Sequence, residues 1–391
     1  MIYVGIDIAK DKHDCLITNS DGEILFPPFT ISNNRIGFND LFDKISSSTN
    51  DLSNVKVGLE ATGHYSYNLL GFLVDKGLTT FVINPLHTNL FRKSLSLRKT
   101  KTDKVDAHTI ATMLMSDVNL KSYSDTSYHN EELKSLTRYR FDKVKERAKL
   151  KSSISRLVTI LFPELEKLVP SLHIASVYAL LAEFPSASSI ASSHLTRLTN
   201  LLLDASNGRY NKDTAILIRN AAKDSIGSNM PAKSLELKHT IKLIRDISCD
   251  ILEIEQAIKA IVDSLQSPIL SIPGISYRMG AMILAEIGDF NRFDSPDKIL
   301  AYAGLSPSTY QSGQFESSHS KMEKRGSRYL RYALYNSAKY VCLWDDTFKT
   351  YLEKKRSEGK HYNVAISHVA KKLVRLIYQL ENSKQSYIKA S

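Results

Sequence analysis

The sequence predicts a mixed α/β domain followed by a long all-α region. Short β-branched runs dominate the first 85 residues, and helical spacing alternates with them only after the third run. From about residue 130 onward the strand-like runs fade, and apolar residues recur at the three- and four-residue spacing of helices. A chain of 391 residues is too long for one compact core of typical size, so we expect two or three domains.

Strand-like composition is concentrated near the N-terminus, in five apolar, β-branched segments: 2–6, 15–18, 24–26, 55–59 and 79–83. The turn between the second and third segments contains Asp21-Gly22, which is a strong hairpin signal. Helical spacing is found in 34–46, 65–76 and 103–116, whereas Asn84-Pro85 ends the fifth strand. A three-strand meander, followed by strands that alternate with helices, fits an RNase H-like fold.

Two long helices are predicted in the middle of the chain. One series repeats at four-three-four spacing from Leu150 to Leu161, and a heptad-like series runs from Leu237 to Leu265, interrupted by Ser248 and Glu255. Such helices form an antiparallel coiled-coil arm, an oligomer seam or the core of a simple bundle. Between them, the Ser/Ala-rich segment 171–227 predicts a small helical insert.

These patterns predict three domains. Residues 1–125 form the RNase H-like domain, and 126–266 form the helical middle region with its insert at about 171–230. The last domain, 267–391, is helical and basic.

The charge balance favours a polyanionic partner, although a generic basic surface is the simpler alternative. The chain has 52 Lys and Arg against 41 Asp and Glu, a formal net charge of +11. Three widely spaced cysteines without a CxxC pair argue against a zinc site and a disulfide framework. We expect a cytoplasmic protein without a membrane partner, because the sequence contains neither a signal peptide pattern nor a spanning apolar run.

Four acidic residues fall where the predicted fold would bring them together. Asp7 ends the first strand and Glu60 ends the fourth, and these strands are neighbours in an RNase H-like sheet. Asp103 and Asp106 lie three residues apart on the next helix, hence on one face. Clustered carboxylates repel one another unless cations are bound, and Mg²⁺ takes oxygen ligands of this kind. Individually, each acid also fits a helix cap or a surface charge.

A polar loop in the C-terminal region places Ser312 beside a glycine. A basic series suited to phosphate contact follows it: Lys321, Lys324, Arg325, Arg328 and Arg331. A serine attacks phosphorus only when its proton is removed and the developing charge is compensated, which guanidinium groups can do. Taken alone, these residues fit better a Ser/Gly loop beside a solvated basic helix.

Six short motifs occur in a fixed order along the chain: GIDIAK at 5–10, EATG at 60–63, KTDKVDA at 101–107, IPGI at 272–275, AGLSP at 303–307 and YQSG at 310–313. Each motif is weak alone; IPGI, for example, is either a structural turn or half of a helix-hairpin-helix motif. The ordered set resembles the DEDD insertion-sequence transposases. These are bridge-RNA-guided recombinases, a family that includes the pilin-gene invertases.

The resemblance implies a RuvC-like domain, a coiled-coil segment and a C-terminal transposase domain. It implies that the four acids match an acidic tetrad that binds Mg²⁺, with Mn²⁺ as a substitute. It also implies that Ser312 matches a serine that attacks DNA and forms a covalent phosphoserine link. One departure is Gly326-Ser327, where the family often has Gly-Asn.

The family's partners follow from the same resemblance. A structured guide RNA pairs with donor and target DNA. Protomers form dimers, and a tetramer when active, in which the serine of one protomer completes a site with the carboxylates of another.

Three other functions fit parts of the sequence. A RuvC-type junction nuclease would use metal-activated water and leave Ser312 without a role. An actin-like sugar or metabolite kinase would need glycine-rich phosphate loops, and the 16 glycines here are scattered. A non-catalytic DNA- or RNA-binding protein would not need the acids.

Overall fold

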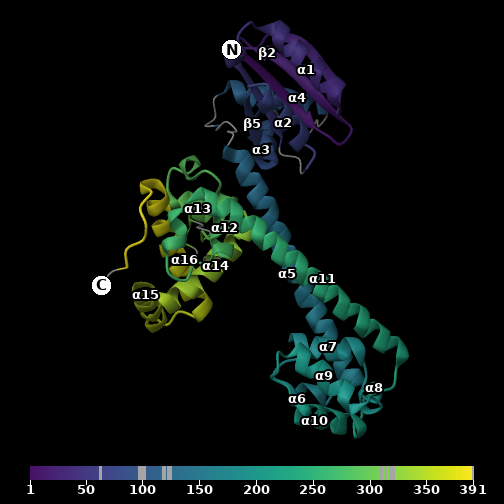
Figure 1. Ribbon diagram of the computed structural model, residues 1–391. Helices are drawn as coiled ribbons and strands as arrows, with labels where there is room; N and C mark the ends of the chain where they lie inside the picture. The colour runs from purple at the N-terminus through teal and green to yellow at the C-terminus, as the bar shows by residue number, and fades with distance from the viewer. Residues whose placement is uncertain are drawn as a thin grey trace. The chain divides into compact units, whose positions relative to one another are not determined.

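The computed structural model describes residues 1–60, 64–95, 103–116, 120, 126–307, 311–312, 315–316 and 322–389 (Figure 1). The chain divides into two compact units, Met1–His129 and Asn130–Ser391. The three-domain division expected from the sequence stays a prediction. Within the described ranges, no helix is long and apolar enough to cross a membrane.

The first unit contains a five-stranded mixed sheet. Its strands are β1 (Ile2–Ile8), β2 (Lys12–Asn19), β3 (Ile24–Ser32), β4 (Val55–Glu60) and β5 (Thr79–Ile83). They lie in the order β3-β2-β1-β4-β5; β1, β2 and β3 are antiparallel neighbours, and β4 lies parallel to both β1 and β5. The predicted mixed sheet is confirmed, and its first and fourth strands are neighbours, as the sequence predicts.

Helices pack on both faces of this sheet. The described helices that pack on the sheet or beside it are α1 (Arg35–Ser48), α2 (Tyr67–Asp75), α3 (Pro85–Leu95) and α4 (Asp103–Met115). Strand residues such as Val4 and Ile6 form one apolar core with α1 and α2. Ala107 and Ala111 of α4 pack instead with Leu16, on the opposite face. Side chains alternate along a strand, so odd-numbered residues of β1 face α4.

The sequence did not predict α3, because Asn84-Pro85 was interpreted only as the end of a strand. Proline also fits the first turn of a helix, where its missing N–H is not needed. The helix begins there: the amides of His87 and Thr88 donate to the carbonyl of Asn84.

The described part of the second unit consists mainly of helices, together with one pair of short strands. Its helices are α5 (Thr126–Leu161), which starts at the boundary, α6 (Leu165–Leu168), α7 (Ala175–Glu183), α8 (Ala187–Ala191), α9 (Leu195–Ala205), α10 (Lys212–Lys223), α11 (Pro231–Leu265), α12 (Tyr277–Ile287), α13 (Pro296–Tyr302), α14 (Arg328–Trp344), α15 (Asp346–Ser357) and α16 (Tyr362–Ser383). The helices α6 to α10 fall between the two long helices, where the insert is predicted.

The two long helices α5 and α11 run antiparallel. Three ion pairs connect them: Arg140–Glu255 at 2.6 Å, Lys143–Asp250 at 2.8 Å and Arg156–Glu236 at 2.8 Å. Along these pairs, the residue number of the α11 partner falls as that of the α5 partner rises, which is the order of an antiparallel pair. Glu255, which interrupts the heptad, is buried, and its other carboxylate oxygen accepts from Arg278 at 2.7 Å. The two arginines compensate a charge that burial would otherwise disfavour. Coiled-coil packing stays a prediction.

The IPGI motif forms a turn packed on the backbone of α14. Gly274 has a φ of +91°, and a Cβ placed on it would lie 2.7 Å from the carbonyl of Tyr340. A residue with a side chain would collide there and would also be strained at this positive φ. The contact favours the structural turn over the helix-hairpin-helix interpretation.

In the first unit, α4 approaches the sheet at two glycines that face each other. Gly5 and Gly58 are register partners on the parallel strands β1 and β4. A Cβ on Gly5 would lie 2.1 Å from the carbonyl oxygen of Ala107, and one on Gly58 would lie 2.8 Å from the side chain of Ile110. Only glycine on these strands lets the helix pack at this distance.

The variant Gly5→Ala should therefore lower the free energy of unfolding by at least about 2 kcal/mol, because the collision is with backbone that cannot rotate away. Urea denaturation measures the effect. The matched control is Gly71→Ala in α2, where a Cβ meets nothing within 4 Å. That change should be neutral or stabilising by up to about 1 kcal/mol. Equal stability of the two variants would contradict the close approach.

Candidate functional site

Asp7 and Glu60 lie on one edge and one face of the sheet. Ile6 and Leu59 are the last register partners of the parallel strands β1 and β4, and the two acids follow them directly. Each acid lies two residues beyond a glycine that contacts α4, so both side chains belong to the α4 face. Both are partly exposed, and both take part in interactions with neighbouring groups. The carboxyl ends of two adjacent strands therefore present two carboxylates together.

The N-terminus of α4 lies toward the same edge. Met115, at the helix C-terminus, lies 3.8 Å from a Cβ placed on Gly22, in the turn beyond Asn19. Asn19 pairs with Ile2, at the start of β1. The helix thus runs opposite to β1, and its first turn points toward the end where Asp7 lies.

That first turn carries the other two predicted acids. Asp103 is the first residue of α4, and its side chain lies outside the described set. Asp106 is 5% exposed, and its carboxylate accepts from Arg92 of α3 at 2.6 Å. Arg92 also donates to the side-chain oxygen of Asn89 at 3.0 Å, which fixes the guanidinium from its own helix. The ion pair stabilises a buried charge that would otherwise be disfavoured.

Asp14 is an acid at this edge that the sequence analysis missed. It is the antiparallel register partner of Asp7, and it is buried on the same face of the sheet. Thr30 of β3 donates to its carboxylate at 2.6 Å. The pairing of Asp7 with Asp14 follows from a tight hairpin centred between Lys10 and Asp11. Two like charges directly opposite each other are unfavourable unless a cation lies nearby.

The donor chemistry of this edge suits a hard divalent cation, because every predicted ligand is a carboxylate. Even so, no three His, Cys, Asp or Glu side chains within the described ranges are arranged to hold a metal ion. The pairing of Asp106 with Arg92 is one physical reason, since a cationic guanidinium engages that carboxylate. Asp7, Glu60 and the first turn of α4 thus share an edge of the sheet.

Ser312 lies in a short antiparallel hairpin of β6 (Gln311–Ser312) and β7 (Phe315–Glu316). Its backbone is described, but its side chain is not. Pro307 and Met322 form an isolated bridge that brackets the hairpin. Lys321, which was predicted to contact nucleic acid, lies outside the described residues.

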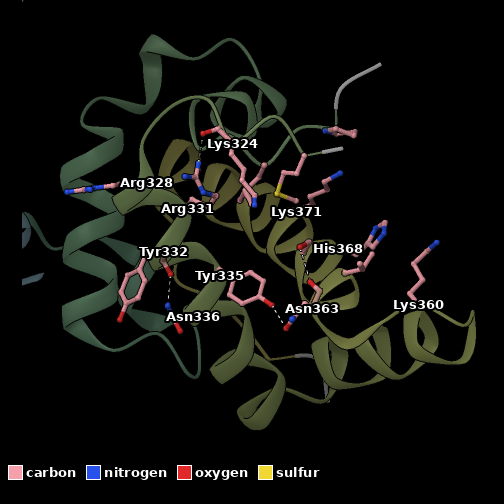
Figure 2. A pocket seen from close by; sticks show the side chains of 15 residues that line it. Lys324, Arg328, Arg331, Tyr332, Tyr335, Asn336, Lys360, Asn363, His368 and Lys371 are labelled. Atoms are coloured by element: carbon pink, nitrogen blue, oxygen red, sulfur yellow. Dashed lines mark hydrogen bonds between the residues drawn. The ribbon is translucent and has the colours of Figure 1, made fainter. Parts of the chain in front are cut away.

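Pro307 and Met322 also line a pocket of about 930 Å³ (Figure 2). Five Lys and Arg side chains contribute to its lining: Lys324, Arg328, Arg331, Lys360 and Lys371. None of the described residues that line it is acidic. Three of the five predicted basic residues therefore gather around one cavity at the base of the Ser312 hairpin. Lys360 and Lys371 were not predicted, because they lie far along the chain, just before and within α16.

The predicted basic residues have different roles. Arg331 donates through Nη1 to the carbonyls of Ala303 at 2.9 Å and Lys324 at 3.2 Å, so it joins two loops. Arg328 is exposed, and its guanidinium donates to the hydroxyl of Tyr329 at 2.8 Å. Arg325 is exposed and does not line the pocket. Arg331 thus shapes the site, whereas Arg328 remains accessible at its margin.

Two glycines bring these loops together. Gly304 has a φ of +66°, and a Cβ there would lie 2.5 Å from the carbonyl of Arg325. Gly326 has a φ of +110°, and a Cβ there would lie 2.1 Å from the carbonyl of Tyr302. The AGLSP motif therefore packs against the entry to α14, which explains why glycine stands at both positions.

A buried carboxylate anchors the start of α14. Ser327 caps the helix and donates to Glu286 of α12 at 2.6 Å. Glu286 is 1% exposed and also accepts from Arg138 of α5 at 2.6 Å and 3.0 Å. The hydroxyl of Ser327 thus accepts from the amide of Leu330 as the helix cap and donates to Glu286. Serine therefore fits this position, where the resembled family often has asparagine.

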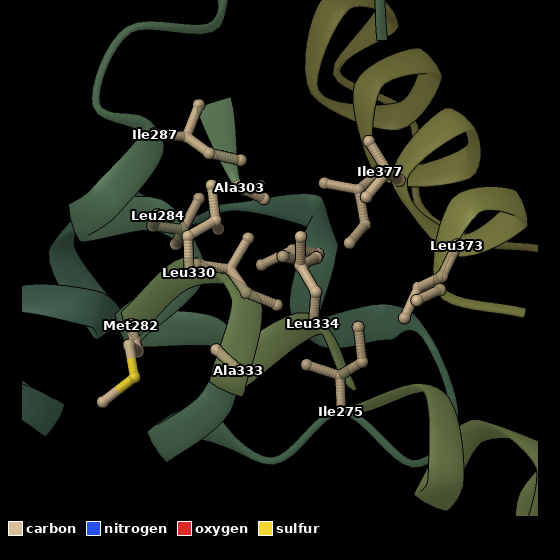
Figure 3. Close-up of a cluster of buried hydrophobic side chains, with 14 of the residues drawn as sticks. Ile275, Met282, Leu284, Ile287, Ala303, Leu330, Ala333, Leu334, Leu373 and Ile377 are labelled. Carbon is tan, nitrogen blue, oxygen red and sulfur yellow. The ribbon is translucent and has the colours of Figure 1, made fainter. Parts of the chain in front are cut away.

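An apolar core lies beneath the pocket-lining helices (Figure 3). Leu330, Ala333 and Leu334 of α14 are fully buried, and they share one cluster with Leu373 and Ile377 of α16. This packing holds the two helices as a rigid base for the side chains that face the pocket.

Two family profiles match the chain. A DEDD profile of the IS110 type, described as a transposase, matches residues 4–163. A profile described as the transposase IS116/IS110/IS902 family matches residues 266–353. Together they cover more than half of the chain, including the acidic edge and the Ser312 hairpin.

Curated relatives match over most of their length. The insertion element IS116 uncharacterized 44.8 kDa protein of Streptomyces clavuligerus is 24% identical over 399 residues, which are 100% of this chain and 96% of that protein. The pilin gene-inverting protein of Moraxella lacunata is 24% identical and covers 99% and 98% of the two chains. The putative transposase for IS117 of Streptomyces coelicolor is 25% identical and covers 80% and 78%.

Among solved structures, T. thermophilus RuvC in complex with a Holliday junction substrate matches 32% of this chain and 99% of that one. The two are 11% identical with a TM-score of 0.23. A score this low does not assign the fold.

The pair between Arg92 and Asp106 should contribute measurably to stability. In Arg92→Met, the buried Asp106 carboxylate loses its partner, so the free energy of unfolding should fall by about 2–3 kcal/mol. Chemical denaturation measures it. The control is Lys93→Met, an exposed neighbour on α3, with an expected change within about 0.5 kcal/mol. Indistinguishable variants would show that the pair contributes nothing.

Proposed function

This chain belongs to the IS110-type DEDD transposases, and we propose on that basis that it is a recombinase that cuts and rejoins DNA strands. The observation that carries the proposal is the shared edge and face of Asp7 and Glu60 beside the acidic first turn of α4. Carboxylates gathered in this way serve metal-assisted phosphoryl transfer. A RuvC-like assignment of the first unit is part of the same proposal.

The acidic residues would hold Mg²⁺, with Mn²⁺ as a substitute; the proposed ligands are Asp7, Glu60, Asp103 and Asp106. A bound divalent ion supplies charge stabilisation at the attacking and leaving oxygens of a phosphate. For Asp106 to serve as a ligand, its carboxylate must turn at least partly from Arg92. Asp14 would position the strand edge behind Asp7 rather than contact substrate, because Thr30 already binds it.

Ser312 is the proposed nucleophile. Its Oγ would form a bond to phosphorus while the bond from phosphorus to a sugar oxygen breaks; the serine proton departs, and the sugar oxygen takes up a proton. A DNA hydroxyl would then attack the phosphoserine and restore the serine, which rejoins the strand. The cationic pocket at the base of the hairpin supports this assignment, since it attracts the phosphate backbone.

The partners follow from family membership. We propose that donor and target DNA are chosen through a structured guide RNA. We also propose that the chain acts as a dimer, and as a tetramer when active. In this arrangement the serine of one protomer completes a site with the acids of another. The antiparallel helices α5 and α11 would form a coiled-coil arm within the assembly.

Replacing Ser312 by alanine should abolish covalent attachment to DNA. Full-length protein would be incubated with DNA carrying the element's junctions and with RNA transcribed from its noncoding end, and adducts would be resolved on a denaturing gel. The unaltered chain and the control Ser306→Ala should both form the adduct. An adduct formed by Ser312→Ala would remove the serine assignment. Free 3′-hydroxyl and 5′-phosphate ends without attached protein would favour a RuvC-type nuclease.

Replacing Asp7 by asparagine should reduce strand transfer by about 100-fold or more, because one carboxylate at the phosphoryl-transfer site is lost. The same recombination assay measures the rate. The control is Asp11→Asn, an exposed residue in the adjoining turn. Circular dichroism melting would establish that both variants are folded. Normal recombination by Asp7→Asn would exclude a role for this edge in catalysis.

A further inference from the structure

Phosphate attraction explains the cations of the pocket but not its concave shape or its apolar lining. The pocket lies between α14 and α16, with Leu305, Pro307, Met322 and Val364 among its lining residues (Figure 2). A duplex backbone needs only a basic outer surface, because phosphate contacts position DNA without entering a cavity. An apolar cavity of this size takes a compact, partly apolar group.

We propose that this pocket binds one unpaired nucleotide of the DNA or RNA, with the base inside and its phosphate against the cationic rim. The inference deepens the proposed function, because it names what the nucleic acid presents to the second unit. Bases in an intact duplex are stacked and cannot enter a pocket, so the nucleotide must be unpaired or extruded.

Aromatic side chains of α14 supply a surface for the base. Tyr332 is 40% exposed and lines the pocket, while Phe141 of α5 contacts its ring edge-on at 4.9 Å between centroids. This contact fixes the ring of Tyr332. Base stacking on tyrosine tolerates any sequence, since every base has an aromatic face. The pocket therefore suits an unpaired nucleotide of any identity.

Two asparagines add hydrogen-bonding groups at the wall. The hydroxyl of Tyr335 donates to Oδ1 of Asn363 at 2.8 Å, which leaves the amide nitrogen of Asn363 as a donor. Nδ2 of Asn336 donates to the carbonyl of Tyr332 at 2.8 Å, so its Oδ1 is the acceptor. A donor and an acceptor of this kind match the edge of a base.

The rim supplies the charge that a nucleotide phosphate needs. Lys324, Arg328 and Lys360 line the pocket and are exposed or partly exposed. His368 of α16 also lines the pocket; burial, followed by the charge of Lys371, lowers its pKa below the ordinary value of 6.5. This shift favours the neutral imidazole, which presents a flat polar ring instead of a further charge.

Binding of the full chain to three fluorescent DNA duplexes tests the inference. They share one sequence and carry no unpaired nucleotide, one unpaired nucleotide, or an abasic site at that position. Anisotropy is measured at one fixed salt concentration, because phosphate contacts depend on salt. The duplex with the unpaired nucleotide should bind about tenfold more tightly than the paired one, and the abasic site should lose this advantage. Equal affinity for all three would overturn the inference.

Variants assign the advantage to the pocket. Tyr332→Ala should remove it, and Tyr332→Phe should retain it, since the ring is kept. Tyr340→Ala, an exposed tyrosine of α14 outside the pocket, should also retain it. Val364→Trp places a large side chain at a half-exposed lining position and should remove it. An advantage that survives Val364→Trp would overturn the pocket as its source.

The result separates this inference from the proposed function. Ser312→Ala should keep the preference for the unpaired nucleotide, because binding in the pocket does not use the serine hydroxyl. A chain that forms the DNA adduct but shows no such preference refutes the pocket and leaves the recombinase standing. A chain that shows the preference but forms no adduct refutes the serine recombinase and leaves the nucleotide pocket standing.

Discussion

The approach of α4 to the sheet is the constraint on which the acidic edge depends. A helix at ordinary distance would hold its first turn away from the strand ends. The glycine pair Gly5 and Gly58 removes two side chains at facing positions, so the helix backbone settles directly on β1 and β4. Asp7, Glu60 and the first turn of α4 then share one edge. The chemistry proposed for the first unit therefore rests on two residues that carry no functional group.

The second unit uses a buried charge for a comparable purpose. Glu286 ties the start of α14 to α12 and α5 through Ser327 and Arg138. Removing a buried charge's partners is strongly unfavourable, so this network fixes the helix entry firmly. The glycine turns at 304 and 326 pack against the same entry. The base of the Ser312 hairpin and one wall of the pocket are thereby held to the long helix α5.

Sequence patterns predicted the strands of the described sheet and the helices α1, α2 and α4, because each is a continuous run with its own periodicity. They missed α3, since a proline there permits either a stop or a start. Consequently they missed Arg92, whose partner Asp106 lies 14 residues away on another helix. Asp14 could be predicted only from the register of the hairpin between β1 and β2. Lys360 and Lys371 could be predicted only from the packing of α16 on α14. Contacts made by tertiary packing leave no periodic signal in the sequence.

The acidic edge of the first unit and the pocket of the second unit are opposite in charge, which would order the events of the proposed reaction. The edge at Asp7 and Glu60 is anionic and repels phosphate unless a cation binds there. The pocket at α14 is cationic, and no acid occurs among its described lining residues, so it attracts phosphate without help. DNA or RNA should therefore associate with the second unit whether or not metal is bound. In the proposed reaction, a bound metal ion would then let the acidic edge accept a phosphate, which would separate binding from cleavage.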